Sequence, residues 1–258
     1  MNNLCSYDAI VFDLFDTLYP WGPDKYSKAL NALCDTVASH CPSSNAEDIH
    51  ARYMDIRVRM SAENLSRLVE NDFTFAIREL VGCFTDKDNE EIVAKSIHNY
   101  DSALAGALTL PDGVSDLLRR LSANYKLGVL SNYPTAGGIR MALERDDLTP
   151  MLAAIVVSSE VGFIKPHPAM FQTVCDKLDC DPGKILFVGD TWESDVVGAC
   201  LAGMPCVRIT PSQSGIEQGQ FFNGHIRKWL ESQANLEWKK AQPLVELMSV
   251  LRLEDWLS

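Results

Sequence analysis

A carboxylate follows a short apolar, β-prone run near the start of the chain. Residues 8–12 lead to Asp13, and Thr17 lies four residues further on, where its hydroxyl could satisfy groups in the turn. Buried strands of parallel sheets end at the edge where open α/β folds bind their ligands. A carboxylate at that edge could attack phosphorus or carbon and form a covalent ester. The same stretch is also typical of a strand that ends in an Asx turn, so it does not decide the matter alone.

Three later segments supply possible partners for this carboxylate. Two more apolar runs end in polar groups, one in Ser131-Asn132 and one in Gly189-Asp190, and a lysine stands between an apolar pair and a proline. Each segment also has an ordinary structural interpretation, as a turn, as a solvated lysine or as the N-cap or first turn of a helix. Read along the chain, the candidate residues are Asp13, Thr17, Ser131, Asn132, Lys165, Asp190 and Asp195.

This series resembles the four motifs of the haloacid dehalogenase superfamily, the hydrolases that use an aspartate nucleophile. The resemblance covers the first strand and then residues from about 111 to about 209. It implies that Asp13 is the nucleophile, with Thr17 in the same catalytic motif. It also implies that Ser131 and Asn132 donate hydrogen bonds to phosphoryl oxygens. Lys165 would neutralise charge on the nucleophile and on the transferred group.

Two carboxylates at one sheet edge repel each other, and one takes up a proton unless a cation lies between them. A hard divalent cation such as Mg²⁺ prefers oxygen ligands and could also bind a substrate phosphate. The resemblance implies that Asp13, the backbone carbonyl of Phe15 and Asp190 bind this ion, while Asp195 orients the ligands or their waters. We therefore expect a Mg²⁺-dependent hydrolase of a small phosphorylated metabolite that forms an aspartyl-phosphate.

The chain departs from the phosphatase pattern two residues after the nucleophile. Phosphatases of the superfamily usually carry a second Asp there as general acid and base, whereas this chain has Phe15, followed by Asp16 where many relatives have Gly. Adjacent residues of an extended turn point in different directions, so Asp16 does not simply replace that acid. An aromatic residue at position 15 resembles the first motif of the 2-haloacid dehalogenases, which need no metal. The Gly189-Asp190 pair does not resemble their fourth motif. A dehalogenase and a non-catalytic protein that binds phosphorylated metabolites are therefore the alternatives.

Composition narrows the possible partners. The 258 residues are 47% hydrophobic, which suits a sizeable core, and 23 basic against 35 acidic residues give a net charge of −12. This acidic balance argues against nucleic acid or an anionic membrane as the main partner. The chain has no apolar run of membrane-spanning length, and its first residues lack the pattern of a signal peptide. The eight cysteines lack CxxC spacing, so we expect reduced structural thiols and a cytoplasmic enzyme. Four cysteines lie in or beside apolar runs: Cys5, Cys175, Cys200 and Cys206.

The spacing of apolar residues predicts two domains. Residues 1–20 and 109–258 alternate strand and helix patterns, which predicts an α/β core with a doubly wound parallel sheet. Residues 21–108 contain four amphipathic helical stripes, the third from Leu65 to Phe84, and predict an inserted helical cap. Arg52, Arg57 and Arg59 on the second stripe could reach a substrate anion, although a solvated helix face is the simpler interpretation. Residues 211–242 give no clear pattern, and 244–257 predict a final strand or helix. The oligomeric state is left open.

Overall fold

The computed structural model describes residues 7–42, 44–85, 89–210, 225–233 and 237–257. Its centre is a six-stranded sheet in the order β3-β2-β1-β4-β5-β6, and each neighbouring pair is parallel. The predicted α/β fold with a parallel sheet is therefore confirmed. The strands are β1 (Ala9–Phe12), β2 (Lys126–Ser131), β3 (Leu152–Val157), β4 (Ile185–Gly189), β5 (Cys206–Ile209) and β6 (Val245–Leu247).

The first strand lies in the middle of the sheet, between β2 and β4. Every residue of β1 and β4 is buried, which explains why both read as continuous apolar runs rather than as alternating patterns. Phe12 at the end of β1 is in register with Val129 of β2 and Val188 of β4. The strand order reverses between β1 and β4. This point of a doubly wound sheet opens a crevice beyond the carboxyl ends of the strands.

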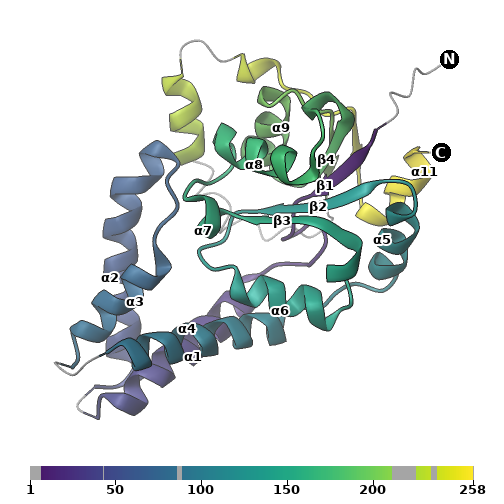
Figure 1. Ribbon diagram of the computed structural model, residues 1–258. Helices are drawn as coiled ribbons and strands as arrows, with labels where there is room; N and C mark the ends of the chain where they lie inside the picture. The colour runs from purple at the N-terminus through teal and green to yellow at the C-terminus, as the bar shows by residue number, and fades with distance from the viewer. Residues whose placement is uncertain (1–6, 43, 86–88, 211–224, 234–236, 258) are drawn as a thin grey trace.

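Helices cover both faces of the sheet (Figure 1). On one side lie α5 (Val114–Ser122) and α6 (Gly137–Arg145), and on the other α8 (Pro168–Leu178) and α9 (Val197–Leu201). Two apolar clusters correspond to these two faces. The shorter helical segments are Leu65–Arg67, Thr149–Met151, α7 (Ser158–Val161), Pro182–Lys184, Trp192–Val196, Trp238–Lys240, Val250–Arg252 and α11 (Leu253–Leu257).

Four longer helices follow β1 and form a separate layer: α1 (Pro23–His40), α2 (Ala46–Asn64), α3 (Phe73–Gly82) and α4 (Glu90–Ala107). The α1 and α4 helices pack against each other, and α4 packs against α6 of the sheet layer (Figure 1). The approach of α4 to α6 depends on Gly138, since a Cβ there would lie 2.7 Å from the Leu104 side chain and 2.8 Å from the Asp101 carbonyl oxygen. The helical layer and one face of the sheet therefore share one continuous apolar core.

The prediction of a third helix from residue 65 was wrong in its start. Residues 65–67 form a short 3₁₀ turn, and Leu68 then takes a left-handed φ of 53°, which ends the helical path. The helix begins at Phe73 because Asp72 caps it: its carboxylate accepts a hydrogen bond from Phe75 N at 2.9 Å. Apolar spacing alone missed this break.

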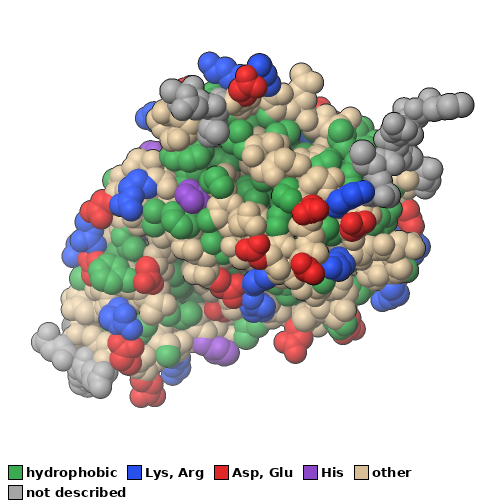
Figure 2. All heavy atoms as spheres, turned by 45° about the horizontal axis from the view of Figure 1, so that its top comes forward, with side chains coloured by type: hydrophobic (Ala, Val, Ile, Leu, Met, Phe, Trp, Pro, Cys, Tyr) green, Lys and Arg blue, Asp and Glu red, His purple; other side chains and the backbone are tan. Residues whose placement is uncertain are grey.

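The C-terminal part contains both elements that were predicted as alternatives, since β6 is followed by α11. Of residues 211–242, those at 211–224 and 234–236 lie outside the described part, and residues 225–232 are helical. Ile226 and Leu230 of this helix pack in one cluster with Leu65, Leu68 and Val197. No helix in the described ranges combines the length and the apolar character that crossing a membrane requires. Figure 2 shows acidic and basic side chains interspersed over one face.

Candidate active site

Lys165 joins two carboxylates at the carboxyl edge of the sheet. Its Nζ lies 2.5 Å from Oδ1 of Asp13 and 2.7 Å from Oδ1 of Asp195. Asp13 directly follows β1, and its backbone N–H donates to the Val188 carbonyl of β4 at 2.8 Å, which extends the sheet pairing to the reactive residue. Lys165 is only 2% exposed. The structure thus brings together three residues that are separated by up to 182 positions in the chain.

Three carboxylates share this site. Asp13, Asp190 and Asp195 each offer an oxygen, and these oxygens all lie within 4.8 Å of one another. Burial raises the pKa of Asp190 to about 9, and repulsion by Asp13 adds to the effect. Burial also raises the pKa of Asp13 to about 7, against the opposing influence of Lys165. Burial acts to lower the pKa of Lys165, but the two carboxylates outweigh it and raise that pKa, which keeps the ammonium charged.

One lysine does not balance three carboxylates, of which Asp13 and Asp195 are buried and Asp190 is half-buried. A hard divalent cation would remove this excess of negative charge, and carboxylate oxygens are the ligands that Mg²⁺ and Ca²⁺ prefer. The Phe15 carbonyl is also compatible with such an ion. The backbone hydrogen bonds of the turn after Asp13 are accepted by the carbonyl oxygens of Leu14 and Tyr19. None of these bonds is accepted by the Phe15 carbonyl oxygen, which is therefore available to an ion. The residues present therefore fit a magnesium ion.

The Gly189-Asp190 pair is explained by the packing of Asp195. A Cβ at residue 189 would lie 2.7 Å from Cβ, Cγ and Oδ2 of Asp195, so only glycine lets this carboxylate come so close to β4. Asp195 belongs to a π-helical turn, Trp192–Val196, and its Oδ2 accepts the Thr191 N–H at 2.9 Å. Such turns are frequent at functional sites. Asp195 is thus held on one side by Thr191 and on the other by Lys165.

Two of the buried hydroxyls without a hydrogen-bond partner belong to predicted site residues. Ser131 Oγ at the end of β2 and Thr17 Oγ1 after β1 make no hydrogen bond within the described ranges. Ser131 is fully buried and Thr17 is 7% exposed. A buried hydroxyl without a partner costs roughly 1–3 kcal/mol. Both groups are therefore available to a bound anion, and a hydrogen bond from Ser131 to phosphoryl oxygens stays a prediction.

Asn132 is engaged differently from the prediction. Its Oδ1 accepts the backbone N–H of Lys165 at 2.7 Å, and its Nδ2 donates to the Lys165 carbonyl at 3.2 Å. The side chain therefore fixes the backbone of the central lysine. A direct contact of Asn132 with substrate stays a prediction.

Phe15 occupies the position of the missing acid and belongs to an aromatic cluster. Its ring centroid lies 4.4 Å from that of Trp21 and 5.1 Å from that of Tyr133. Asp16 has a left-handed φ of 61°, and its Oδ1 accepts the Trp21 N–H at 2.9 Å. Its carboxylate thus stabilises the turn, as expected for an Asp in this backbone region.

The three arginines of α2 have different surroundings. Arg52 and Arg59 are exposed, and Arg59 pairs with Glu79 at 2.6 Å. Arg57 is half-buried and donates to the Tyr26 hydroxyl. The interpretation as a solvated helix face was therefore wrong for Arg57. A signal was present in the sequence, because Arg57 lies on the opposite flank of the buried stripe from the other two.

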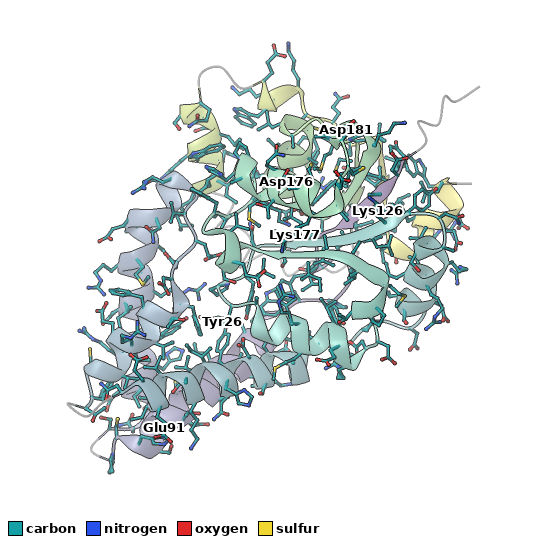
Figure 3. The ribbon with its side chains drawn as sticks, in the orientation of Figure 1. Tyr26, Glu91, Lys126, Asp176, Lys177 and Asp181 are labelled. Atoms are coloured by element: carbon teal, nitrogen blue, oxygen red, sulfur yellow. The ribbon has the colours of Figure 1, made fainter. Side chains whose placement is uncertain are left out.

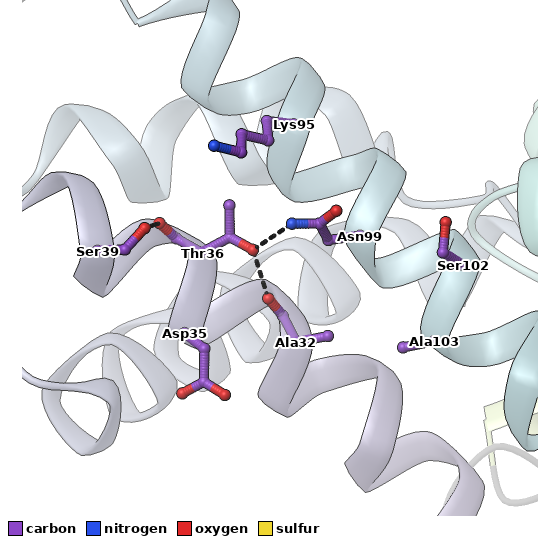
Figure 4. A pocket seen from close by; sticks show the side chains of 8 residues that line it. All are labelled: Ala32, Asp35, Thr36, Ser39, Lys95, Asn99, Ser102 and Ala103. Atoms are coloured by element: carbon purple, nitrogen blue, oxygen red, sulfur yellow. Dashed lines mark hydrogen bonds between the residues drawn. The ribbon is translucent and has the colours of Figure 1, made fainter.

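Three other features take no part in the contacts among Asp13, Lys165 and Asp195. His167 is a turn residue, as expected: its Nδ1 accepts the Ala169 N–H at 3.2 Å and caps α8. A groove between α1 and α4 is lined mainly by small and polar side chains, including Thr36 and Asn99 (Figure 4), and it shares no residue with the candidate site. The thiols of Cys175 and Cys206 are buried, while Cys5 lies outside the described residues.

The fold and the site define a hydrolase-like α/β protein with an aspartate and a lysine at the switch point of its sheet. The haloacid dehalogenase-like hydrolase family matches residues 7–203, and the chain belongs to this family. It is therefore a hydrolase, and its curated relatives include phosphatases.

Three similar proteins illustrate this relationship. A glyceraldehyde 3-phosphate phosphatase of Methanopyrus kandleri is 25% identical over 205 residues, which are 78% of this chain and 83% of that protein. A phosphoglycolate phosphatase of Haemophilus influenzae is 24% identical over 246 residues, 95% of this chain and 98% of that protein. A crystal structure of a 2-haloacid dehalogenase from Pseudomonas syringae has a TM-score of 0.73 at 20% identity and covers 97% of this chain and 98% of its own. The last likeness shows the fold alone.

Proposed function

We propose that the protein is a Mg²⁺-dependent phosphatase that hydrolyses small phosphorylated metabolites through a phosphate ester on Asp13. The observation that carries the proposal is the buried Asp13–Lys165–Asp195 arrangement with Asp190 beside it. Dehalogenation needs no metal, so the excess of carboxylates over cations at this site is better explained by a phosphatase. The phosphatase names among the relatives support the same reaction class.

In the first step, a carboxylate oxygen of Asp13 attacks phosphorus. The new O–P bond forms as the ester P–O bond breaks, and the leaving oxygen keeps the electron pair and takes a proton from solvent. In the second step, water attacks phosphorus, the O–P bond to Asp13 breaks, and inorganic phosphate leaves. Lys165 neutralises one oxygen of Asp13 throughout.

The other residues of the site orient the reacting groups. Ser131 and Thr17 offer their hydroxyls to the phosphoryl group or the nucleophile, and Asn132 holds Lys165. A bound Mg²⁺, held by Asp13, the Phe15 carbonyl and Asp190 and oriented by Asp195, would supply positive charge to the phosphoryl oxygens. We assign residues 1–20 and 109–258 to the catalytic core and residues 21–108 to a helical cap that borders the site.

The test measures phosphate release from an aryl phosphate and halide release from a 2-haloacid, each with Mg²⁺ and with a chelator. We expect phosphate release that stops with chelator and returns with Mg²⁺. Asp13→Asn should abolish turnover and keep the fold, because the amide is nearly isosteric but a poor nucleophile. Lys165→Ala should lose most of the activity.

Halide release in chelator would instead establish the dehalogenase alternative, which Phe15 favours. Phosphate binding without turnover of any ester would establish the non-catalytic alternative. An Asp13→Asn variant with near wild-type turnover would remove Asp13 as the nucleophile.

A further inference from the structure

Arg57 of α2 is a half-buried cation with most of its donors unused. Its Nη1 donates to the Tyr26 hydroxyl, and its guanidinium carbon lies 5.0 Å from the centre of the Tyr26 ring. A guanidinium has five N–H donors, and no other hydrogen bond or ion pair of Arg57 is formed within the described ranges. Tyr26 lies on the inner side of the helical layer, facing the sheet layer (Figure 3).

The groups around Arg57 are phenols and one carboxylate. The hydroxyl groups of Tyr26, Tyr53, Tyr100 and Tyr133 lie near Arg57, and Tyr26 is in direct contact with it. Glu70 is the nearby carboxylate, and each of its oxygens accepts a hydrogen bond from another group. Oε1 accepts the Asn71 N–H at 2.9 Å, and Oε2 accepts the Ser158 hydroxyl. Glu70 therefore balances part of the charge without closing an ion pair.

These groups connect Arg57 to the candidate active site. Ser158 Oγ accepts the Tyr133 N–H at 2.8 Å. Tyr133 follows Ser131 by two residues, and its ring lies 5.1 Å from that of Phe15, which follows Asp13 by two residues. Tyr133 thus lies near Arg57 on one side and contacts Phe15 of the nucleophile's turn on the other.

We propose that Arg57 binds a carboxylate of the substrate, so that the substrate is a phosphorylated hydroxy acid. This inference rests on the proposed phosphatase function and names the substrate class of the same site. The planar fork of a guanidinium matches a carboxylate through two parallel hydrogen bonds, and the Tyr26 ring beneath it limits its motion. A chain of net charge −12 repels a second anionic group unless a local cation binds it. Arg57 is such a cation.

The experiment compares three substrates in the presence of Mg²⁺: phosphoglycolate, its primary amide and an aryl phosphate without a second charge. For the wild type, we expect kcat/KM to be roughly 10- to 100-fold higher for the acid than for the amide, the range expected for hydrogen bonds between charged groups. Arg57→Gln should remove this preference, so that kcat/KM for the acid falls to about the value for the amide. Arg57→Lys should keep part of the preference, because the charge stays and the fork is lost.

Arg59→Gln is the matched control, since Arg59 lies on the other flank of the same helix, and it should keep the full preference. A second readout avoids turnover. The phosphonate analogue of the acid, whose P–C bond is not cleaved, should inhibit aryl phosphate hydrolysis with a Ki that rises by the same factor in Arg57→Gln. Melting temperatures of both variants confirm folding.

Failures of the two proposals are distinguishable. Absence of aryl phosphate hydrolysis overturns the proposed function. Hydrolysis of aryl phosphate with equal rates on acid and amide overturns only the role of Arg57. A preference for the acid that survives in Arg57→Gln overturns it as well.

Discussion

The side-chain amide of Asn132 binds both backbone polar groups of Lys165, with distances of 2.7 Å to the nitrogen and 3.2 Å to the oxygen. Through this contact the loop after β2 holds the lysine that pairs with Asp13 and Asp195. The position of the ammonium is therefore set by two segments that are 33 residues apart. Asn132, which the sequence suggested as a substrate ligand, thus has a structural role in positioning Lys165.

We expect Asn132→Ala to lower kcat about tenfold with little change in KM. The variant loses two hydrogen bonds, each contributing about 0.5–1.5 kcal/mol, and a factor of ten corresponds to about 1.4 kcal/mol. Steady-state kinetics on an aryl phosphate with Mg²⁺ measures both constants. Asn71→Ala, which removes an amide from the helical layer, is the control. A higher KM at unchanged kcat would show instead that Asn132 contacts the substrate, as the sequence suggested.

Asp190→Asn should stabilise the metal-free protein. The raised pKa of Asp190 means that folding disfavours its charged form, owing to burial first and to Asp13 second. For a carboxyl whose folded pKa is raised, stability is present below the unfolded pKa of about 4 and is lost as pH rises toward the folded value of about 9. In chelator, the melting temperature of the variant should therefore exceed that of the wild type by an amount that grows from pH 5 to pH 8. A gain of about 1 kcal/mol raises Tm by about 2–4 °C.

With Mg²⁺, the melting temperature of the wild type should instead exceed that of Asp190→Asn. An ion that binds only the folded wild type adds about 2.7 kcal/mol at 100 times its Kd, whereas the variant lacks one carboxylate ligand. Thermal melts with chelator and with Mg²⁺ provide the comparison. An equal wild-type Tm in chelator and in Mg²⁺ would contradict metal binding at this site.

His167 should make stability fall below neutral pH. Burial lowers the pKa of its imidazole, and its Nδ1 caps α8 only when that nitrogen is unprotonated. For a group with a lowered folded pKa, the stability is present above the unfolded value and is lost as pH falls through the folded one. His167→Asn keeps a capping oxygen that does not titrate. Between pH 7.5 and 5, the wild type should lose about 0.5–2 kcal/mol more than this variant, the worth of a cap.

Urea unfolding at several pH values measures this difference. His50→Asn, at an exposed position of α2, should keep the wild-type pH dependence. Equal slopes for His167→Asn and the wild type would exclude the cap as the source.

The sequence predicted the parts of the site that follow strands. Asp13, Ser131 and Asp190 each end an apolar run, and parallel strands bring such ends to one edge. The long-range partners of these residues needed the structure, because Lys165 lies in a turn and Asp195 in a π-helical turn. The sequence of neither turn tells where the side chain of its Lys or Asp residue points. The pairing of Lys165 with Asp195 was therefore not predicted.

The helical layer shows a different limit. Apolar spacing predicted four helices but not the left-handed Leu68 or the Asp72 cap, which are local hydrogen-bonding features. Spacing also placed Arg57 on one flank of its helix without telling which flank meets the sheet layer. That choice depends on how α2 packs against α1 and α3, which are tertiary contacts.

The replacement of the usual acid by Phe15 should shape the kinetics. General acid–base catalysis typically contributes ~10²–10⁴-fold. Without this group, esters with strongly basic leaving groups should be poor substrates, while acyl and aryl phosphates should be relatively good ones. The same group normally activates the water that hydrolyses the phosphoenzyme. Rapid-quench kinetics with an aryl phosphate should therefore show a burst of product before the steady state.

Phe15→Asp should shrink this burst and raise turnover on alkyl phosphates, because the carboxylate can protonate the leaving oxygen and then activate water. Phe15→Asn is the matched control, since it removes the same ring from Trp21 and Tyr133 without adding an acid. Its alkyl phosphate turnover should stay at or below that of the wild type. A wild-type enzyme with no burst and equal rates on alkyl and aryl esters would show that another group supplies the acid. Asp16 is then the first residue to test, although its carboxylate accepts the Trp21 N–H in the structure.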